Sequence, residues 1–460
     1  MITTSDKSRR DFIKKTTLVS AGTLAVPTIV PSTIFGKNAP SNRINIGMIG
    51  TGRHGIGRNL RMFLELDNCL VTALNDPDSW RMERAKERVD EVYSKQKGKN
   101  YAGTKMYNDY RDLLADQNVD AVMISSPDHW HVPHGIAAAF AGKHVSVEKA
   151  LSVCFSHSKA LVEAVKKTNV RNRLDSEFRT VENFWRGVEI VHNGLIGKVK
   201  HVEIGVPAEL SGSAVGPQPI MPVPEDLNYD MWLGVAFPAP YTHHRVHHPR
   251  DLRTRPGWMR INDYCNGMIT NWGAHLCDIA VWGIRKEFEL PKKVSGTGTF
   301  SKGLWNTIET FSVDYEYADG VTMRYSIDEP FTKFIGENGW VKVGYRDILE
   351  VSNPEFLKRD PAKMEFDYSG VLSDKADFLQ SIKTGEESLQ PIEGGHIVYF
   401  INVMGLIAVK LGRELTWDNE KQLFVDDTAA NTLLNRPIRE KWLDADVAEW
   451  INKYQKVPLS

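Results

Sequence analysis

A chain of 460 residues is long enough for two or three domains and excludes a single small module. Its composition, 42% hydrophobic and 25% charged, is typical of a folded globular protein and excludes a disordered or fibrous one. The 57 basic residues nearly balance the 58 acidic residues, so the net charge of -1 gives no field that would attract nucleic acid. The four cysteines form no C-x-x-C pair and are too sparse for a disulfide framework, so we expect free, buried thiols.

The first 40 residues have the features of a twin-arginine export signal followed by a linker. The pair Arg9-Arg10 precedes an apolar pair and a lysine, and the weakly apolar run 16–31 contains no acidic residue. A basic amphipathic helix is the alternative, but Gly22 and Pro27 would interrupt it. The run is shorter than the roughly 20 residues of a membrane span, and we expect no longer apolar segment later in the chain. We therefore expect a soluble periplasmic protein that does not span the membrane, and leave cleavage of the signal open.

A glycine-rich loop follows a short apolar strand predicted at residues 44–49. Its sequence is Gly50-Thr51-Gly52-Arg53-His54-Gly55, and a helix-like stretch continues to residue 66. This is G-x-G-x-x-G in the strand-turn-helix context that binds the pyrophosphate of a dinucleotide. In that role the first glycine permits a tight turn, the second lets backbone N–H groups approach the phosphates, and the third lets helix and strand pack closely. We expect these six residues to bind a cofactor; the alternative is a glycine turn without a ligand.

The next predicted strand, at 70–74, ends in Asn75-Asp76, roughly 20 residues after the glycines. An acidic side chain at this place accepts hydrogen bonds from the ribose hydroxyls and repels a 2′-phosphate. Asp76 therefore predicts NAD as the cofactor in preference to NADP.

Strands and helices continue to alternate after Asp76. Helices are predicted at 79–95, 110–115 and 133–141, and strands at 121–124 and 144–147. This alternation indicates a parallel sheet, whose ligands bind at the carboxyl ends of the strands. Ser126 and Lys149 follow two of those ends, so we expect them beside Gly50 and Asp76 in one crevice. We place this Rossmann NAD-binding domain at residues 41–168.

Four further segments give the chain a resemblance to the Gfo/Idh/MocA oxidoreductase family, in particular to its exported bacterial branch that acts on sugars. They are Ser126-Pro127-Asp128-His129-Trp130-His131, Glu148-Lys149, Ser176-Glu177-Phe178-Arg179-Thr180 and the region 271–278. The resemblance implies that Ser126, Pro127, His131, Glu148 and Lys149 contact the cofactor. The family usually has proline after the Glu-Lys pair, where this chain has Ala150.

The second half of the chain has longer predicted strands, at 199–206, 309–317, 321–327 and 340–344. Such strands are typical of a mostly antiparallel sheet with one exposed face, and the family's second domain is an open sheet of this kind. We expect this α+β substrate domain to occupy residues 169–460, with a C-terminal tail that packs back on both domains. Its sheet is also where we expect any homo-oligomer contact. The irregular stretch 205–260 is expected to line the rim of the active site.

The resemblance implies hydride transfer from a sugar C–H to the nicotinamide, which needs a base for the adjacent hydroxyl proton. We expect His275 to be the main acid/base and Lys149 to assist it; the alternatives are a structural histidine and a phosphate-facing lysine. Asn271 stands where the family usually has aspartate, so it is expected to orient a hydroxyl and not to take up a proton. Glu177, Arg179 and Asp278 are expected to contact the substrate. For Glu177 and Arg179 the alternative is a surface ion pair.

The run His243-His244-Arg245-Val246-His247-His248 suggests a metal site at first sight. Zinc ligands come from a fixed scaffold, and adjacent histidines usually point apart, so we expect a loop at the substrate rim and no metal.

Taken together, these features predict an exported NAD-dependent oxidoreductase that converts a ring hydroxyl of a glycoside to a keto-sugar. Two alternatives remain open. One is a redox-neutral glycosidase that uses NAD only transiently, and the other is a non-catalytic sugar or nucleotide sensor on the same fold.

Overall fold

The first sheet is parallel throughout and has the strand order β3-β2-β1-β4-β5-β6. The computed structural model describes residues 43–98, 100–209 and 215–455, so the predicted export signal lies outside the described residues. The strands of this sheet are β1 (Ile44–Ile49), β2 (Cys69–Asn75), β3 (Lys105–Tyr107), β4 (Ala121–Ile124), β5 (His144–Glu148) and β6 (Asn172–Asp175). Every residue of β4 is buried, because a parallel sheet is covered on both faces.

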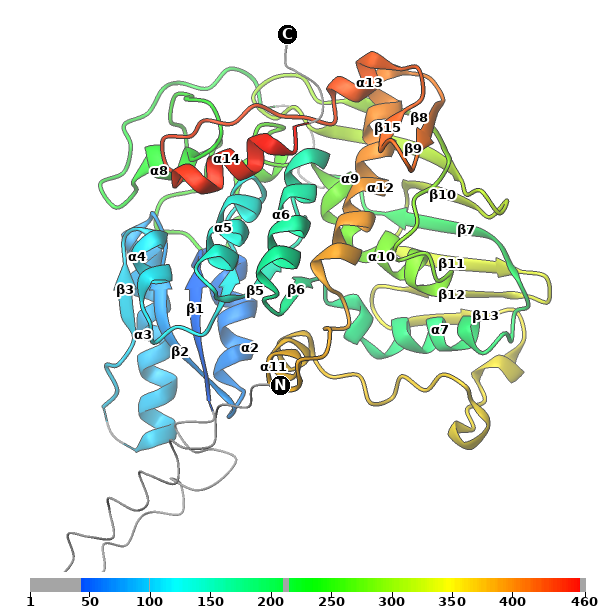
Figure 1. The fold of residues 1–460 in the computed structure, drawn as a ribbon, viewed down its shortest axis with the longest axis horizontal. Helices are drawn as coiled ribbons and strands as arrows, with labels where there is room; N and C mark the ends of the chain where they lie inside the picture. Colours follow the sequence, from blue (N-terminus) through cyan, green and yellow to red (C-terminus); the bar gives the residue numbers. More distant parts are fainter. Residues whose placement is uncertain (1–42, 99, 210–214, 456–460) are drawn as a thin grey trace, which may run out of the picture. The chain divides into compact units, whose positions relative to one another are not determined.

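Helices connect these strands in the order that the alternation predicts. A π-helical turn at Gly55–Leu60 runs into α2 (Arg61–Leu64), and the longer helices are α3 (Ser79–Lys97), α4 (Tyr110–Ala115), α5 (Asp128–Phe140) and α6 (Phe155–Thr168). Figure 1 shows α5 and α6 side by side across the sheet. Because β6 pairs with β5, the sheet extends to Asp175, beyond the boundary expected at residue 168.

The second sheet has the order β13-β12-β11-β7-β10-β9-β8-β14-β15 and is antiparallel except where β7 and β10 pair. Its strands are β7 (Val199–Val206), β8 (Lys293–Phe300), β9 (Ile308–Glu316), β10 (Thr322–Ile327), β11 (Phe331–Gly336), β12 (Trp340–Gly344), β13 (Ile348–Val351), β14 (Leu415–Asp418) and β15 (Leu423–Phe424). Buried and exposed residues alternate along β10, as one covered face requires. This confirms the expected fold class, a Rossmann domain followed by an α+β domain with a mostly antiparallel sheet.

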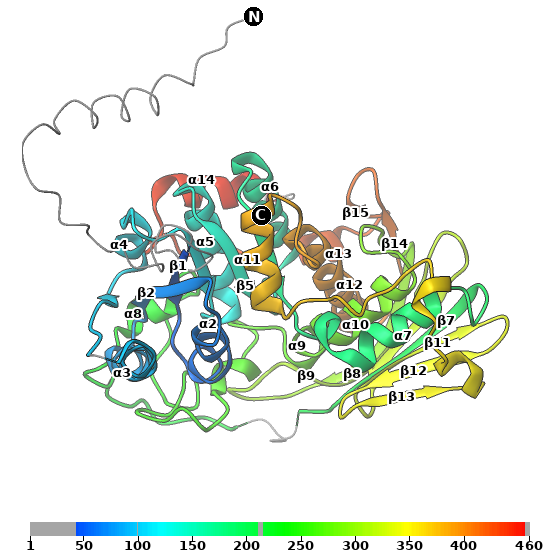
Figure 2. The same cartoon turned by 90° about the horizontal axis from the view of Figure 1, so that it is seen from below.

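One face of the second sheet is covered by α7 (Glu182–His192), α10 (Gly273–Gly283) and α12 (Ile392–Leu411), as Figure 2 shows. The last of these is a correction to the expectation that no later segment is apolar over the length of a membrane span. α12 has 20 residues and a mean hydropathy of 1.6 in its most apolar window, but 89% of that window is buried. This burial shows that α12 is a core helix of the second domain, which explains its apolar sequence.

The C-terminal segment lies against the first domain. α14 (Ala445–Lys453) contacts α5 and α6, and the Trp450 indole N–H donates to the carbonyl of Ala160 at 2.9 Å. The Tyr110 hydroxyl donates to the carbonyl of Trp442 at 3.0 Å. The four cysteine side chains are buried and form no disulfide within the described residues, as expected.

The described part of the stretch 205–260, expected to be irregular, contains the short helix α8 (Tyr229–Leu233), and its residues from Leu227 on form a hydrophobic cluster of their own with residues up to Tyr264. Buried members of this cluster include Trp232, Val246, Ile261 and Tyr264. The connection is therefore a packed substructure.

Candidate functional site

A cavity of about 530 Å³ lies at the carboxyl ends of β1, β2, β4 and β5. The cofactor residues expected from the sequence that line it are Gly50, Gly52, Arg53, His54, Asp76, Ser126, Pro127, His131, Glu148 and Lys149. The second domain contributes Glu177, Asn271 and His275 to the same wall. The predicted loop and the predicted catalytic residues are therefore brought together in one site.

The glycine loop has the shape that a pyrophosphate needs. Gly50 has φ +94°, and a Cβ there would lie 2.6 Å from the backbone nitrogen of Ser126. A Cβ on Gly55 would lie 2.6 Å from the carbonyl oxygen of Gly50, so this glycine lets the following helix pack closely on the turn. Nothing lies within 4 Å of a Cβ at Gly52, which faces the cavity. The loop therefore fits a dinucleotide whose phosphates approach the backbone at Gly52.

Asp76 directly follows β2 at the cavity wall, and its carboxylate accepts hydrogen bonds from the glycine loop. One oxygen accepts from the backbone N–H of Thr51 at 2.6 Å and from the Thr51 hydroxyl at 3.2 Å. The other accepts from the backbone N–H of Asp78 at 2.9 Å. Thr51 itself does not line the cavity; it connects Asp76 to the loop. Burial and the neighbouring charge of Asp78 raise the pKa of Asp76 to about 6.

The segment after β4 forms part of the cavity wall. The two ring nitrogens of His131 lie 2.7 Å from the carbonyls of Ser126 and Ala150, so this side chain ties together the turns that follow β4 and β5. The Ser126 hydroxyl is in turn 3.1 Å from Nδ1 of His134. The peptide bond between Lys149 and Ala150 is cis.

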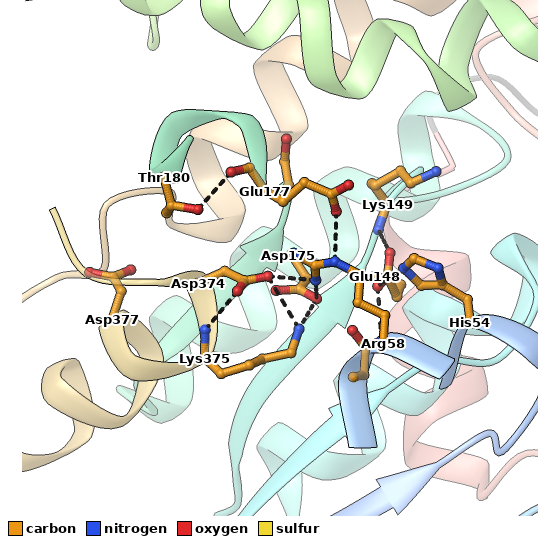
Figure 3. A network of polar contacts seen from close by, with 12 residues as sticks. His54, Arg58, Glu148, Lys149, Asp175, Glu177, Thr180, Asp374, Lys375 and Asp377 are labelled. Carbon is orange, nitrogen blue, oxygen red and sulfur yellow. Dashed lines mark hydrogen bonds and ion pairs between the residues drawn. The ribbon is translucent and has the colours of Figure 1, made fainter. Parts of the chain in front are cut away.

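Lys149, Asn271 and His275 surround the part of the cavity next to the second domain. In the described part of the chain, the Lys149 ammonium has no hydrogen bond or ion pair, and Figure 3 shows its side chain directed away from Glu148. The His275 ring stacks on Phe178 with centroids 4.5 Å apart, and its Nδ1 lies 3.4 Å from the Ser176 hydroxyl. Burial and the charge of Lys149 hold the pKa of His275 well below its usual value, so the ring is neutral at neutral pH.

A network of charged side chains connects residues of this wall to one another and to neighbouring elements, as Figure 3 shows. His54 Nε2 lies 3.0 Å from a carboxylate oxygen of Glu148, and the Asn59 amide donates to the same oxygen at 2.9 Å. Burial alone would raise the pKa of Glu148, but His54, Lys375 and Lys149 together outweigh burial and hold that pKa well below its usual value. Glu148 is therefore a buried carboxylate that fixes the glycine-loop residue His54.

The same network continues through Arg58 to α11 (Asp374–Thr384). The Arg58 guanidinium lies 3.3 Å from the carboxylate of Glu177 and donates to Asp374 at 2.7 Å. Lys375 donates to Asp175 at the end of β6. Glu177 thus both pairs with an arginine, the alternative considered above, and lines the cavity.

Arg179 and Asp278 do not line the cavity. Their side chains form an ion pair with contacts of 2.6–3.1 Å, and both are almost completely buried. The expectation that they contact substrate is corrected: the pair joins the segment before α7 to α10. Asp278 lies one helical turn after His275, but its side chain is buried in the protein. An unpaired charge there would be strongly destabilising, so Asp278 pairs with Arg179.

Sequence reasoning did not select several cavity residues. Asp128, at the start of α5, is buried, and burial raises its pKa to about 8 despite the nearby Lys149, so it is protonated at neutral pH. It lies inside the segment 126–131 that carried the family resemblance, which is the signal that could have identified it. Tyr345 adds aromatic surface at the cavity beside Trp272, a tryptophan that the sequence suggests as a candidate for stacking on a sugar ring. Tyr345 follows a strand end, and no local pattern marks it.

The histidine run departs from expectation. The rings of His243 and His244 lie 4.3 Å apart between centroids and do not point away from each other, and His248 joins them. His247 instead lies at the cavity wall with Nε2 3.0 Å from the carboxylate of Asp78.

Two family descriptions match the chain. Residues 44–175 match the NAD-binding Rossmann fold of the Gfo/Idh/MocA oxidoreductase family. Residues 189–444, more than half of the chain, match the C-terminal alpha/beta domain of the same family.

Curated relatives are similar over part of the chain only. A myo-inositol 2-dehydrogenase of Thermotoga maritima is 34% identical over 157 residues, which cover 34% of this chain and 42% of the relative. A glycosyl hydrolase family 109 protein 2 of Shewanella sp. (strain ANA-3) is 28% identical over 221 residues, covering 44% of this chain and 46% of the relative. The chain thus spans less than half of the length of these relatives.

Solved structures match the fold over most of the chain. A levoglucosan dehydrogenase in complex with NADH and levoglucosan has a TM-score of 0.59 at 17% identity, covering 81% of this chain and 99% of that one. An aldose-aldose oxidoreductase from Caulobacter crescentus, complexed with glycerol, has the same TM-score and coverage at 15% identity. At these identities the match shows the fold alone.

Proposed function

Because the chain belongs to the Gfo/Idh/MocA oxidoreductase family, with an NAD-binding Rossmann domain and sugar dehydrogenases among its neighbours, we propose that it oxidises a ring hydroxyl of a glycoside to a keto-sugar. The observation that carries this proposal is the single cavity that joins the glycine loop and Asp76 to Lys149, Asn271 and His275. The first group would hold the cofactor, and the second would supply a base, a cation and an amide in the same cavity.

Glycoside oxidation needs the removal of one hydride and one proton. When bound, NAD supplies the hydride acceptor at C4 of its nicotinamide. The neutral imidazole of His275 takes the hydroxyl proton, and Ser176 at Nδ1 leaves Nε2 as the nitrogen that faces the ligand. The carbon that loses the hydride and the oxygen that loses the proton become the new carbonyl.

The neighbouring side chains orient the sugar and stabilise the charge that develops on its oxygen. The Lys149 ammonium donates to that oxygen, and such placed electrostatic stabilisation is usually a large contribution to catalysis. Asn271 binds a hydroxyl through its amide and leaves the proton to His275. The indole of Trp272, next to His275 with centroids 6.2 Å apart, offers an apolar surface for a sugar ring.

Export is part of the proposal and is supported by Arg9-Arg10 and the apolar run that follows. The twin-arginine route carries folded proteins, so a cofactor bound in the cytoplasm travels with the protein. Because little free NAD is found outside the cytoplasm, activity there requires that NAD leave the site slowly. We therefore expect NAD to copurify with the full chain expressed in the cytoplasm.

A redox-neutral glycosidase is the second candidate, and the resemblance to glycosyl hydrolase family 109 proteins favours it. The same first step would then be followed by elimination of the glycosidic leaving group with the proton next to the new carbonyl, addition of water in its place, and return of the hydride and a proton to the carbonyl. A sensor without catalysis is the third candidate, although Lys149 and His275 at the cavity wall argue against it.

The test is a panel of glycosides that differ in sugar and in aglycone, incubated with the NAD-loaded protein. Reduced nicotinamide is followed by absorbance, and keto-sugar and released aglycone by mass spectrometry. Keto-sugar with reduced cofactor supports the dehydrogenase. Aglycone release without net reduction identifies the glycosidase, and binding without either product identifies the sensor.

A further inference from the structure

Three histidine side chains converge at one point of the loop that precedes α9 (Met268–Asn271). One ring nitrogen from each of His243, His244 and His248 lies within 4.8 Å of the other two. All three residues are half-buried, and none of them lines the cavity. They are therefore a group separate from the catalytic residues, although the neighbouring His247 lies at the cavity wall.

The backbone that carries these side chains is fixed from both sides. Val246, between His244 and His248, is completely buried in the hydrophobic cluster of this loop. The carbonyl of His244 accepts from the Trp305 indole at 2.9 Å. A Cβ on Gly257 would lie only 1.8 Å from that carbonyl oxygen, so the two segments pack in direct contact. Metal ligands require a fixed scaffold of this kind. The sequence pattern alone gave no sign of one, which was the reason to expect no metal.

The same turn is hydrogen-bonded to residues of the nucleotide-binding domain. The His247 side chain reaches the carboxylate of Asp78, which caps α3 by accepting from the backbone N–H of Arg81 at 3.1 Å. The Arg81 guanidinium donates to the carbonyls of His248 and Asp251 at 3.3 and 2.7 Å. Asp78 lies two residues after Asp76, so the loop is attached beside the position that binds the cofactor ribose.

We propose that His243, His244 and His248 bind one divalent transition-metal ion of the zinc class, and that this ion fixes the loop over the cofactor cavity. Three imidazole nitrogens suit Zn²⁺ and its transition-metal neighbours, whereas Mg²⁺ and Ca²⁺ require oxygen ligands. Tetrahedral Zn–N bonds of about 2.0–2.1 Å place the ligand nitrogens a few ångströms apart, and the three ring nitrogens here lie within 4.8 Å of one another. Water completes the coordination.

The ion links two turns of the loop whose backbone is bonded to Arg81. Opening the loop away from the end of β2 then requires either breaking metal contacts or moving the whole loop. The consequence is that the bound ion slows the release of NAD.

Metal binding is tested on the full chain after removal of any affinity tag, since an oligohistidine tag binds the same ions. Metal-free protein is prepared with a chelator and titrated with Zn²⁺ in a calorimeter. The expected result is one ion per chain, with at least tenfold weaker binding in the double variant His243→Ala/His248→Ala. The control is His201→Ala on β7, which removes an imidazole far from the loop and should leave binding unchanged. Absence of binding, or equal binding in the double variant, overturns the proposal.

Spectroscopy keeps the test decisive if the double variant does not fold. Co²⁺ bound by three imidazoles and water gives the intense visible bands of low coordination, whereas adventitious surface Co²⁺ in water gives weak ones. The expected result on the unaltered chain is one equivalent of the intense species, displaced by Zn²⁺. Only weak bands overturn the site.

The effect on the cofactor has a readout independent of turnover. NAD release is followed in a stopped-flow experiment by protein fluorescence, with and without one equivalent of Zn²⁺. The release rate should fall several-fold on addition of Zn²⁺ in the unaltered chain and in His201→Ala, and stay constant in the double variant. An equal release rate with and without the metal contradicts the proposed link between ion and loop.

Discussion

Asp76 makes cofactor affinity depend on pH in a range that is easy to measure. Its carboxylate has a pKa of about 6, because burial and the charge of Asp78 both favour the protonated form. Above pH 6 the carboxylate is ionised, and we expect it to accept hydrogen bonds from the ribose hydroxyls of NAD. Below pH 6 it is protonated and loses one acceptor, so NAD affinity should fall as the pH decreases.

The size of the effect follows from the pKa. If only the ionised form binds NAD well, the apparent dissociation constant rises about tenfold between pH 7 and pH 5, which is about 1.4 kcal/mol of binding free energy. In Asp76→Asn this dependence should vanish, and affinity should be low at every pH. In Asp78→Asn, which keeps a good helix cap, the midpoint should move to lower pH because a neighbouring negative charge is gone.

The assay is a calorimetric or fluorescence titration with NAD at pH 5, 6, 7 and 8. Asp90→Asn, an acidic residue of α3 away from the cavity, is the matched control and should behave as the unaltered chain. Thermal melting at each pH shows that the protein is folded. An affinity that is constant from pH 5 to pH 8, or a dependence that persists in Asp76→Asn, refutes the role of this carboxylate.

Three further predictions follow from other parts of the structure. Lys149→Ala and His275→Ala should each slow turnover by roughly 10²–10⁴-fold while NAD binding by titration is largely kept; near-normal turnover in His275→Ala would remove it as the base. Arg179→Ala should destabilise the fold by about 3–5 kcal/mol in urea unfolding, because it leaves the Asp278 charge buried and unpaired, and a small loss would show that the pair is not needed. Replacing Arg9 and Arg10 by lysine should retain the protein in the cytoplasm by cell fractionation, and export equal to that of the unaltered chain would contradict the signal assignment.

The first domain could be predicted well because its signals are local. β1, β4 and α4 begin and end where the apolar runs and turn residues placed them, and the glycine loop has a sequence motif of its own. α5 begins at Asp128 and not at residue 133, so Pro133, which served as the expected helix start, lies inside the helix. The second sheet was predicted only in part. β8 contains two glycines and two threonines among eight residues, which gives no alternation of apolar and polar positions.

The parts of the site that could not be predicted depend on residues far apart in the chain. Arg58 and Asp374 are separated by 316 positions, so no spacing rule connects them. The convergence of His243, His244 and His248 depends on the fold of a loop and on a buried valine within it. Asp278 shares a helix with His275 at a spacing that permits a common face, but burial directs it to Arg179 instead of the cavity.

The central claim is that this cavity carries out NAD-dependent oxidation of a glycoside, and a single-turnover experiment tests it most directly. The full chain is loaded with one equivalent of NAD, freed of excess nucleotide and mixed with a glycoside that it binds; reduced nicotinamide and keto-sugar are then measured in the same sample. We predict equal amounts of the two products, approaching one per loaded site. Consumption of the glycoside without reduced nicotinamide, or a bound glycoside that remains unchanged, would contradict the claim.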